Sequence, residues 1–93
     1  MNMSKHATVR AQQRGIRRPV LDLILTLGDR KTRVAGGLWA ISMSDDRAAE
    51  LQRAGVPAQE IERVRGVNAI VNLEREMVVT VEHAIANSRR YHR

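Results

Sequence analysis

Cysteine and phenylalanine are absent from this chain of 93 residues, and its only tryptophan and tyrosine are Trp39 and Tyr91. Without cysteine the chain forms no disulfide, has no thiol nucleophile and cannot hold zinc through sulfur. Proteins that bind single strands of nucleic acid by stacking usually interleave several aromatic rings with their positive charges. Two rings are too few, so a stacking platform of that kind is not expected.

Long apolar runs are missing as well. No stretch approaches the 18 apolar residues of a membrane-spanning helix, and the N-terminus lacks the apolar segment of a secretory signal. We therefore expect no membrane partner and a cytoplasmic location. No metal site is expected, because His6, His83 and His92 have no second ligand at the short spacings typical of zinc sites. No cofactor is expected either, since Gly36-Gly37 is not followed by the Lys-Ser/Thr pair and the helix of a phosphate-binding loop.

What the chain has in excess is arginine. Of its 16 basic residues only Lys5 and Lys31 are lysine, and 10 acidic residues leave a net charge of +6. Such a charge attracts anionic partners at long range, and the planar guanidinium binds phosphate through paired hydrogen bonds. Nucleic acid is therefore the expected partner, and a solvated basic surface without a partner is the alternative.

Two helices are predicted over residues 4–28. Ser4 and Gly15 are the start and stop signals of the first helix, and Pro19 and Gly28 have the same roles in the second. The second helix is apolar over most of its surface, so it must be buried. We expect it to form the centre of the core, with the alanine side of the first helix packed against it.

The rest of the chain predicts strands on both sides of a charged helical segment. Residues 29–44 predict the first strands, 45–65 a helical insertion, 67–83 a C-terminal hairpin and 84–93 a basic tail. No repeat or linker divides the chain, so residues 1–93 are expected to form one domain. Its class is α+β: two N-terminal helices packed on a small antiparallel sheet of about four strands, with the helical insertion between strands 2 and 3.

The first helix carries a stripe of candidate functional side chains. His6, Arg10 and Arg14 recur every four residues and so share one helix face, while His83 ends the last strand on its apolar side. Metal-independent cleavage of RNA needs a base, an acid and cations that stabilise the charge developing on phosphate. His6 and His83 are candidates for the base and the acid, and the two arginines for binding phosphate, provided that both histidines line one pocket. The other candidate nucleic-acid contacts are Lys5, Arg17, Arg18, Arg89, Arg90, Tyr91 and Arg93.

Each candidate also has a purely structural interpretation. In that interpretation His6 bonds a carboxylate or a backbone carbonyl, and His83 is a buried core histidine. The tail is then a solvated chain end. Arg10 and Arg14 form ion pairs with acidic residues of the C-terminal hairpin, which are Glu74, Glu76 and Glu82.

Three features together resemble a known family. They are His-x-x-x-Arg-x-x-x-Arg-Gly-Ile at residues 6–16, the apolar helix that ends at Gly28, and Val-Val-Thr-Val-x-His at residues 78–83, which basic residues follow. The family consists of small bacterial domains that are similar to a branch of the RelE/ParE-like toxin superfamily. The resemblance covers both ends of the chain and implies two N-terminal helices against an antiparallel sheet of about four strands. Members of the superfamily include ribosome-dependent or free ribonucleases, gyrase poisons and proteins with no shown catalysis.

Three functions stay open at this point. The first, which the resemblance implies, is a toxin of a bacterial toxin–antitoxin system that cleaves RNA as a metal-independent endoribonuclease and is neutralised by an acidic antitoxin segment. The second is a non-catalytic protein that binds nucleic acid, RNA more than DNA, or the ribosome. The third is a protein-binding regulator of a bacterial or phage conflict system, which docks on its partner through Trp39 and residues 45–65 and therefore predicts an exposed apolar patch there.

Overall fold

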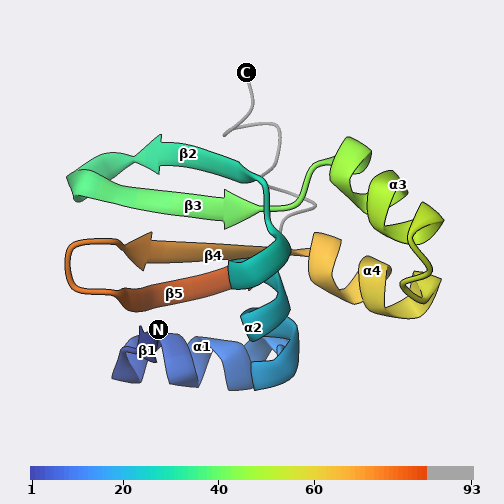
Figure 1. The fold of residues 1–93 in the computed structure, drawn as a ribbon. Coiled ribbons are helices and arrows are strands. Elements are labelled where there is room, and N and C mark those ends of the chain that lie inside the picture. The colour runs from blue at the N-terminus through green and yellow to red at the C-terminus, as the bar shows by residue number, and fades with distance from the viewer. Residues whose placement is uncertain (84–93) are drawn as a thin grey trace.

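The computed structural model describes residues 1–83 and has an α+β fold (Figure 1). In chain order its elements are β1 (Asn2–Met3), α1 (Lys5–Arg14), α2 (Arg18–Leu27), β2 (Arg30–Val34), the short 3-10 turn η1 (Ala35–Gly37), β3 (Leu38–Ser42), α3 (Asp45–Arg53), α4 (Ala58–Arg65), β4 (Val67–Asn72) and β5 (Met77–His83). The strands form one sheet in the order β1-β5-β4-β3-β2. No helix of residues 1–83 is both long and apolar enough to cross a membrane.

The predicted α+β class is confirmed, but the sheet and the order of helices and strands differ from the RelE/ParE-like arrangement that the resemblance implies. In the described part of the chain the sheet has five strands and is mixed, because β1 pairs with β5 in parallel while the other neighbouring strands pair antiparallel. A strand of two residues is too short to show the alternation from which strands are predicted. The helical insertion consists of α3 and α4 and lies between β3 and β4.

The ends of α1 follow its capping residues. The hydroxyl oxygen of Ser4 accepts a hydrogen bond from the amide of Ala7 at 3.0 Å, which confirms the predicted N-cap. Gly15 follows the helix with a φ of +67°, a conformation that strongly favours glycine. The hydroxyl of Ser4 also donates to the carbonyl oxygen of Val79 at 2.9 Å. The first turn of α1 is therefore tied directly to β5.

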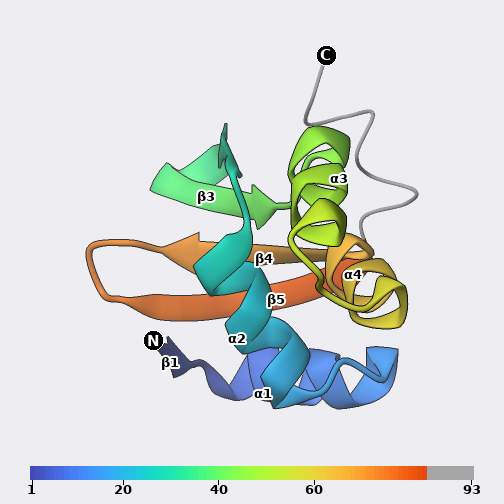
Figure 2. The same ribbon diagram turned by 45° about the vertical axis from the view of Figure 1, so that its right-hand side comes forward.

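α1 lies beside β5 at the edge of the sheet, and Figure 1 and Figure 2 both show it running along the strand. The helix and the strand run in the same direction. The amide of Ser4 donates to the carbonyl oxygen of Val78 near the start of β5, and the His83 ring at its end reaches the carbonyl oxygen of Arg14. α1 therefore packs chiefly on β5, whereas the sequence predicts that its alanine side packs on α2.

α2 crosses one face of the sheet, where it packs on β3 and β4 and also contacts α4 (Figure 2). Leu21 and Ile24, on its inner side, are fully buried. The end of α2 comes so near the sheet that a β-carbon on Gly28 would lie 2.9 Å from Cγ2 of Ile41. The absence of a side chain at this junction therefore sets how closely α2 sits on the sheet.

A polar cluster ties α3 to the end of α2. Both carboxylate oxygens of Asp29 accept hydrogen bonds from Ser44, one from its amide at 2.8 Å and one from its hydroxyl at 2.6 Å. Partial burial disfavours the charged carboxylate, but these bonds and the positive charge of Arg30 outweigh it and lower the pKa of Asp29. Ser44 also caps α3 by accepting from the amide of Arg47, whose guanidinium donates to the carbonyl oxygen of Leu27 at 3.2 Å. The helical insertion is thus held in a defined place beside α2.

Candidate nucleic-acid interface

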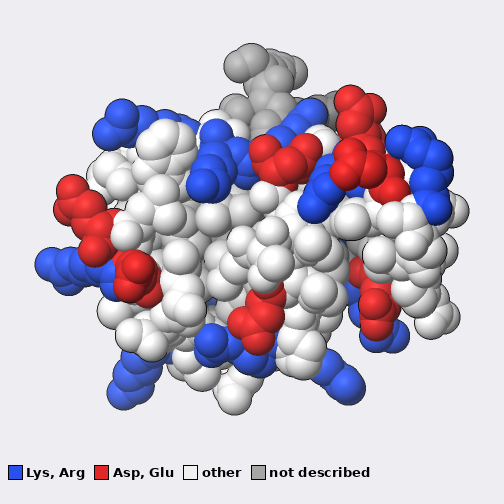
Figure 3. Space-filling model, viewed as in Figure 1, with Lys and Arg blue, Asp and Glu red and all other residues white. Residues whose placement is uncertain are grey.

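Positive charge gathers on the N-terminal part of the fold. Residues 1–21, which form β1, α1 and the start of α2, contain five positive charges and no negative one. Figure 3 shows basic groups along the lower border, over α1, and also along the upper border, over β2 and α3, where acidic groups lie beside them; further acidic groups lie at the β4–β5 turn. The five residues, called the basic surface below, are Lys5, Arg10, Arg14, Arg17 and Arg18.

Neighbouring acids leave most of the basic surface uncompensated. The ion pairs between residues of the described part of the chain are Arg18 with Asp22, Arg47 with Glu50, and Arg65 with both Asp45 and Glu62. Arg10 donates to the side-chain oxygen of Gln13 at 3.4 Å, and neither Arg10, Arg14 nor Arg17 pairs with an acidic residue among residues 1–83. The ion pairs that the structural interpretation expected between α1 and the C-terminal hairpin are therefore not formed there. Three guanidiniums of the basic surface are left to bind an anion.

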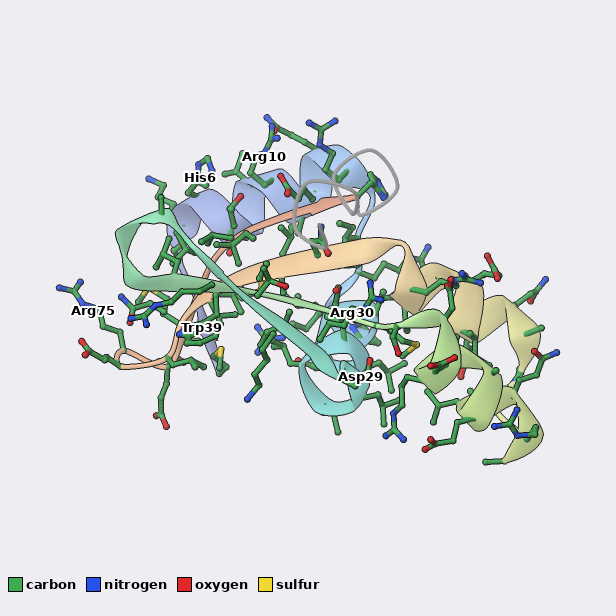
Figure 4. All side chains as sticks on the ribbon, turned by 90° about the horizontal axis from the view of Figure 1, so that it is seen from above. His6, Arg10, Asp29, Arg30, Trp39 and Arg75 are labelled. Atoms are coloured by element: carbon green, nitrogen blue, oxygen red, sulfur yellow. The ribbon has the colours of Figure 1, made fainter. Side chains whose placement is uncertain are left out.

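The stripe on α1 is arranged as its spacing predicts. His6 and Arg10 project from the same side of the helix (Figure 4), and Arg14 follows one turn later. His6 is exposed and makes no side-chain hydrogen bond within residues 1–83, so the structural interpretation in which it bonds a carboxylate or carbonyl finds no partner there. Arg10 is half-buried, as expected for a residue at the edge of a contact.

His83 is also exposed, so its interpretation as a buried core histidine is wrong. Its Nε2 lies 3.1 Å from the carbonyl oxygen of Arg14. Because a carbonyl oxygen can only accept, Nε2 carries the hydrogen in this contact. In the neutral ring the lone pair is then on Nδ1, which is the atom left to accept a proton from a ligand.

The two histidines do not share a pocket. His83 contacts Arg14 in the last turn of α1, whereas His6 is in the first turn, eight residues earlier and about 12 Å away along the helix axis. The predicted pair of a base and an acid is therefore not assembled. The predicted site required the first helix to meet the end of the last strand, but the sequence did not give their relative direction. Because α1 and β5 run in the same direction, the start of the helix, with His6, lies beside the start of the strand. His83 lies at the other end of the strand.

The turn between α1 and α2 separates two hollows. The first, the α1–α2 groove, has a volume of about 540 Å³. The second, the His83 hollow, has a volume of about 450 Å³ and lies between this turn, the end of α4 and the end of β5. Gly15, Ile16 and Arg17 line both hollows, so the Arg17 side chain stands at the boundary between them.

The His83 hollow has the composition of an anion site. Its lining residues include Arg17, Arg63 and His83. Its acidic lining residue is Glu62, which is already bound to Arg65. Guanidinium groups bind phosphate oxygens strongly through charge-assisted hydrogen bonds. A phosphate group is therefore the ligand that this set of side chains fits best.

Arg63 is the site residue that sequence reasoning missed. It lies in the segment 45–65, which the sequence predicts as a helical insertion and not as part of a site. No local motif connects Arg63 with His83, because their proximity depends on how α4 leads into β4 and on the pairing of β4 with β5. The pairing of Val67 with His83 places the end of α4 next to the end of β5.

Other predicted features are not found or lie elsewhere. The exposed large apolar side chains of residues 1–83 are Met1, Val9 and Leu73, so the patch predicted over residues 45–65 is missing. Trp39 is half-buried, and the guanidinium of Arg33 lies 5.5 Å from the centre of its ring.

Residues 1–83 contain no group of three or more histidine, aspartate or glutamate side chains that could hold a metal ion. The predicted nucleic-acid contacts outside the described residues are Arg89, Arg90, Tyr91 and Arg93.

Comparison of the chain with models of protein families, with curated proteins and with solved structures found no match. The function must therefore be argued from the basic surface and the two hollows.

Proposed function

We propose that this chain is a cytoplasmic nucleic-acid-binding protein, with RNA as the preferred partner, whose basic surface contacts backbone phosphates without cleaving them. The observation that carries the proposal is the concentration of five positive charges and no negative charge in residues 1–21. One residue of this basic surface, Arg17, also lines the His83 hollow, together with Arg63 and His83. The preference for RNA rests on the resemblance to RelE/ParE-like toxins.

Binding of this kind has a characteristic dependence on salt. Each phosphate that an arginine neutralises releases counterions, and for a single strand log K then falls with log salt by about 0.7 for each contact. Arg10, Arg14, Arg17 and Arg63 form no ion pair with a described acidic residue. Four such contacts give a slope of about −3, so that affinity falls about 50-fold between about 50 and 200 mM salt.

Fluorescence anisotropy with an end-labelled single-stranded RNA measures both the affinity and the slope. Arg14→Ala combined with Arg17→Ala should weaken binding and make the slope shallower by about 1.4. Arg53→Ala combined with Arg75→Ala is the matched control, because it removes the same charge from two exposed arginines. Arg53 ends α3, and Arg75 lies in the β4–β5 turn (Figure 4). The control should keep the wild-type slope. Equal losses in both double variants, or no binding at low salt, would refute the proposal.

A second candidate function is the metal-independent endoribonuclease of a RelE/ParE-like toxin, and the His83 hollow favours it. With Nε2 held by the Arg14 carbonyl, Nδ1 of His83 is available to take the proton of a 2′-hydroxyl as that oxygen attacks phosphorus. Arg17 and Arg63 would stabilise the charge that develops on the phosphate oxygens. The departing 5′-oxygen then takes its proton from water, because His6 is two turns of helix away.

Induced expression in bacteria distinguishes the two candidates. A ribonuclease arrests growth and fragments cellular RNA, including RNA on the ribosome, and co-expression of an acidic antitoxin segment that covers the basic surface should relieve the arrest. His83→Ala should abolish the effect, whereas His6→Ala should leave it unchanged because His6 lies outside the hollow. Growth and RNA that stay normal on expression of the wild type would favour the non-catalytic function. An arrest that needs His6 and not His83 would contradict the site described above.

A further inference from the structure

The α1–α2 groove differs from the His83 hollow in its chemistry. Its apolar lining residues, called the floor below, are Met3, Ala11, Ile16 and Leu21. Thr8 and Gln12 of α1 line it from one side and the arginines of the α1–α2 turn from the other. An apolar hollow with a few polar groups at its margin is typical of sites that hold the flat body of a small organic group.

We propose that the α1–α2 groove receives one unstacked base of a single-stranded nucleic acid, an inference that rests on the proposed function. The base would lie on the aliphatic floor, so this binding needs no aromatic platform. The groove volume of about 540 Å³ lies in the range of sites that hold small organic ligands. In a duplex the bases are stacked and paired, and only a single strand offers a base that can leave the stack at little cost.

The polar groups at the margin suit the edge of a base. Gln12 is exposed, and its side-chain amide makes no hydrogen bond within residues 1–83, so it keeps both a donor and an acceptor for a ligand. The hydroxyl of Thr8 donates to the carbonyl oxygen of Ser4 at 3.1 Å, which leaves it as an acceptor. Base edges present donors and acceptors in pairs, which an amide matches well.

The two arginines of the turn have different roles. Arg18 is held by Asp22, at 3.0 Å from its Nε, and by the carbonyl oxygen of Met1, at 3.0 Å from its Nη2, so it forms a fixed wall of the groove. Arg17 forms no such contact and lines both hollows. A base in the groove would therefore place its own phosphate at Arg17 and the neighbouring phosphate toward Arg63 and His83. The surrounding positive charge favours a nucleic acid over other ligands with a flat apolar body.

The test uses a single-stranded RNA that carries the fluorescent base 2-aminopurine, and the same strand annealed to its complement. The wild-type protein should bind the single strand at least about tenfold more tightly than the duplex at equal salt. Binding should also raise the 2-aminopurine emission, because the probe is brighter when it is unstacked. Gln12→Ala should weaken binding of the single strand about 2- to 12-fold, the range expected for one hydrogen bond.

Gln52→Ala is the matched control, since Gln52 is an exposed glutamine of α3 that lines neither hollow and makes no side-chain hydrogen bond within residues 1–83. Ala11→Leu, which fills the groove, is a second variant, and its circular-dichroism melt shows whether it folds. If single strand and duplex bind equally, and Gln12→Ala behaves like Gln52→Ala, the base-binding inference is refuted while the proposed function is not. If polyglutamate competes as well as RNA of equal charge, the groove has no role in recognition. If neither nucleic acid binds, both proposals are refuted.

Discussion

Replacing Gly28 by alanine tests how closely α2 is seated on the sheet. The added β-carbon would lie 2.5 Å from the carbonyl oxygen of Ile24, 2.9 Å from Cγ2 of Ile41 and 3.0 Å from the carbonyl oxygen of Ser42. Two of these three atoms belong to the backbone, so rotation of a side chain cannot relieve the crowding. The φ of Gly28 is −62°, which alanine adopts readily. Any loss of stability would therefore come from crowding and not from backbone conformation.

The expected loss is a balance of two effects. Overpacking of a closely packed site costs about 1–3 kcal/mol, and replacing glycine by alanine recovers about 0.4–1 kcal/mol by restricting the unfolded chain. We expect a net loss of about 1–2 kcal/mol, which lowers the melting temperature of a domain of this size by about 4–16 °C. Urea unfolding followed by circular dichroism measures this loss of stability, which should appear as a lower urea midpoint with an unchanged m-value.

Gly66→Ala is the matched control for Gly28→Ala. Gly66 also has a negative φ, of −81°, but the nearest atom to its added β-carbon is the carbonyl oxygen of Glu62 at 3.5 Å, an ordinary contact. This control should leave stability unchanged or raise it by up to about 1 kcal/mol. If Gly28→Ala unfolds at the same urea concentration as the wild type, or if both variants lose the same stability, the close approach of α2 to β3 is refuted.

Two further predictions concern the polar cluster and the α1–α2 turn. The pKa of Asp29 is lowered in the folded protein, so its carboxylate adds stability above the pKa of the unfolded chain, and that stability is lost as the pH falls through the lower folded value. Between about pH 5 and pH 2 the urea midpoint should therefore fall more for the wild type than for Asp29→Asn, and identical pH profiles would contradict the role of the bonds from Ser44. Gly15→Ala places a β-carbon on a residue with a φ of +67° and should cost about 1–2 kcal/mol, whereas Gly15→Asn should cost less because asparagine tolerates this conformation. Equal urea midpoints for the two variants would show that backbone conformation does not limit this turn.

Local chemistry explains what the sequence predicts correctly. Ser4 caps α1 and Gly15 ends it because a cap depends only on residues within one turn of the helix end. The hairpin of β4 and β5 is equally local, and it begins and ends at the residues of the predicted hairpin 67–83. The shared face of His6 and Arg10 follows from the helix period alone.

What the sequence does not show is set by contacts between distant residues. β1 is a strand because Asn2 pairs with Met77. A segment of two residues is too short for alternation of apolar and polar side chains to predict a strand. The direction of α1 along β5 depends on hydrogen bonds from Ser4 to Val78 and Val79, more than 70 residues later in the chain. The same direction brings His83 to Arg14 and keeps it away from His6. The candidate site was therefore predicted as a set of residue types, and its assembly required the fold.

The separation of the two imidazoles also predicts which histidine RNA cleavage depends on, if the His83 hollow cleaves RNA. A reaction that uses one histidine as the base and the other as the acid loses rate when either is replaced. In this fold His83 lines the hollow and His6 does not, since His6 is about 12 Å away along the axis of α1. His83→Gln should therefore lower kcat about 100- to 10,000-fold, the contribution expected of a general base, whereas His6→Gln should keep the wild-type kcat. Equal losses of kcat in the two variants would mean that His6 does reach the reacting phosphate, and the parallel arrangement of α1 and β5 would be wrong.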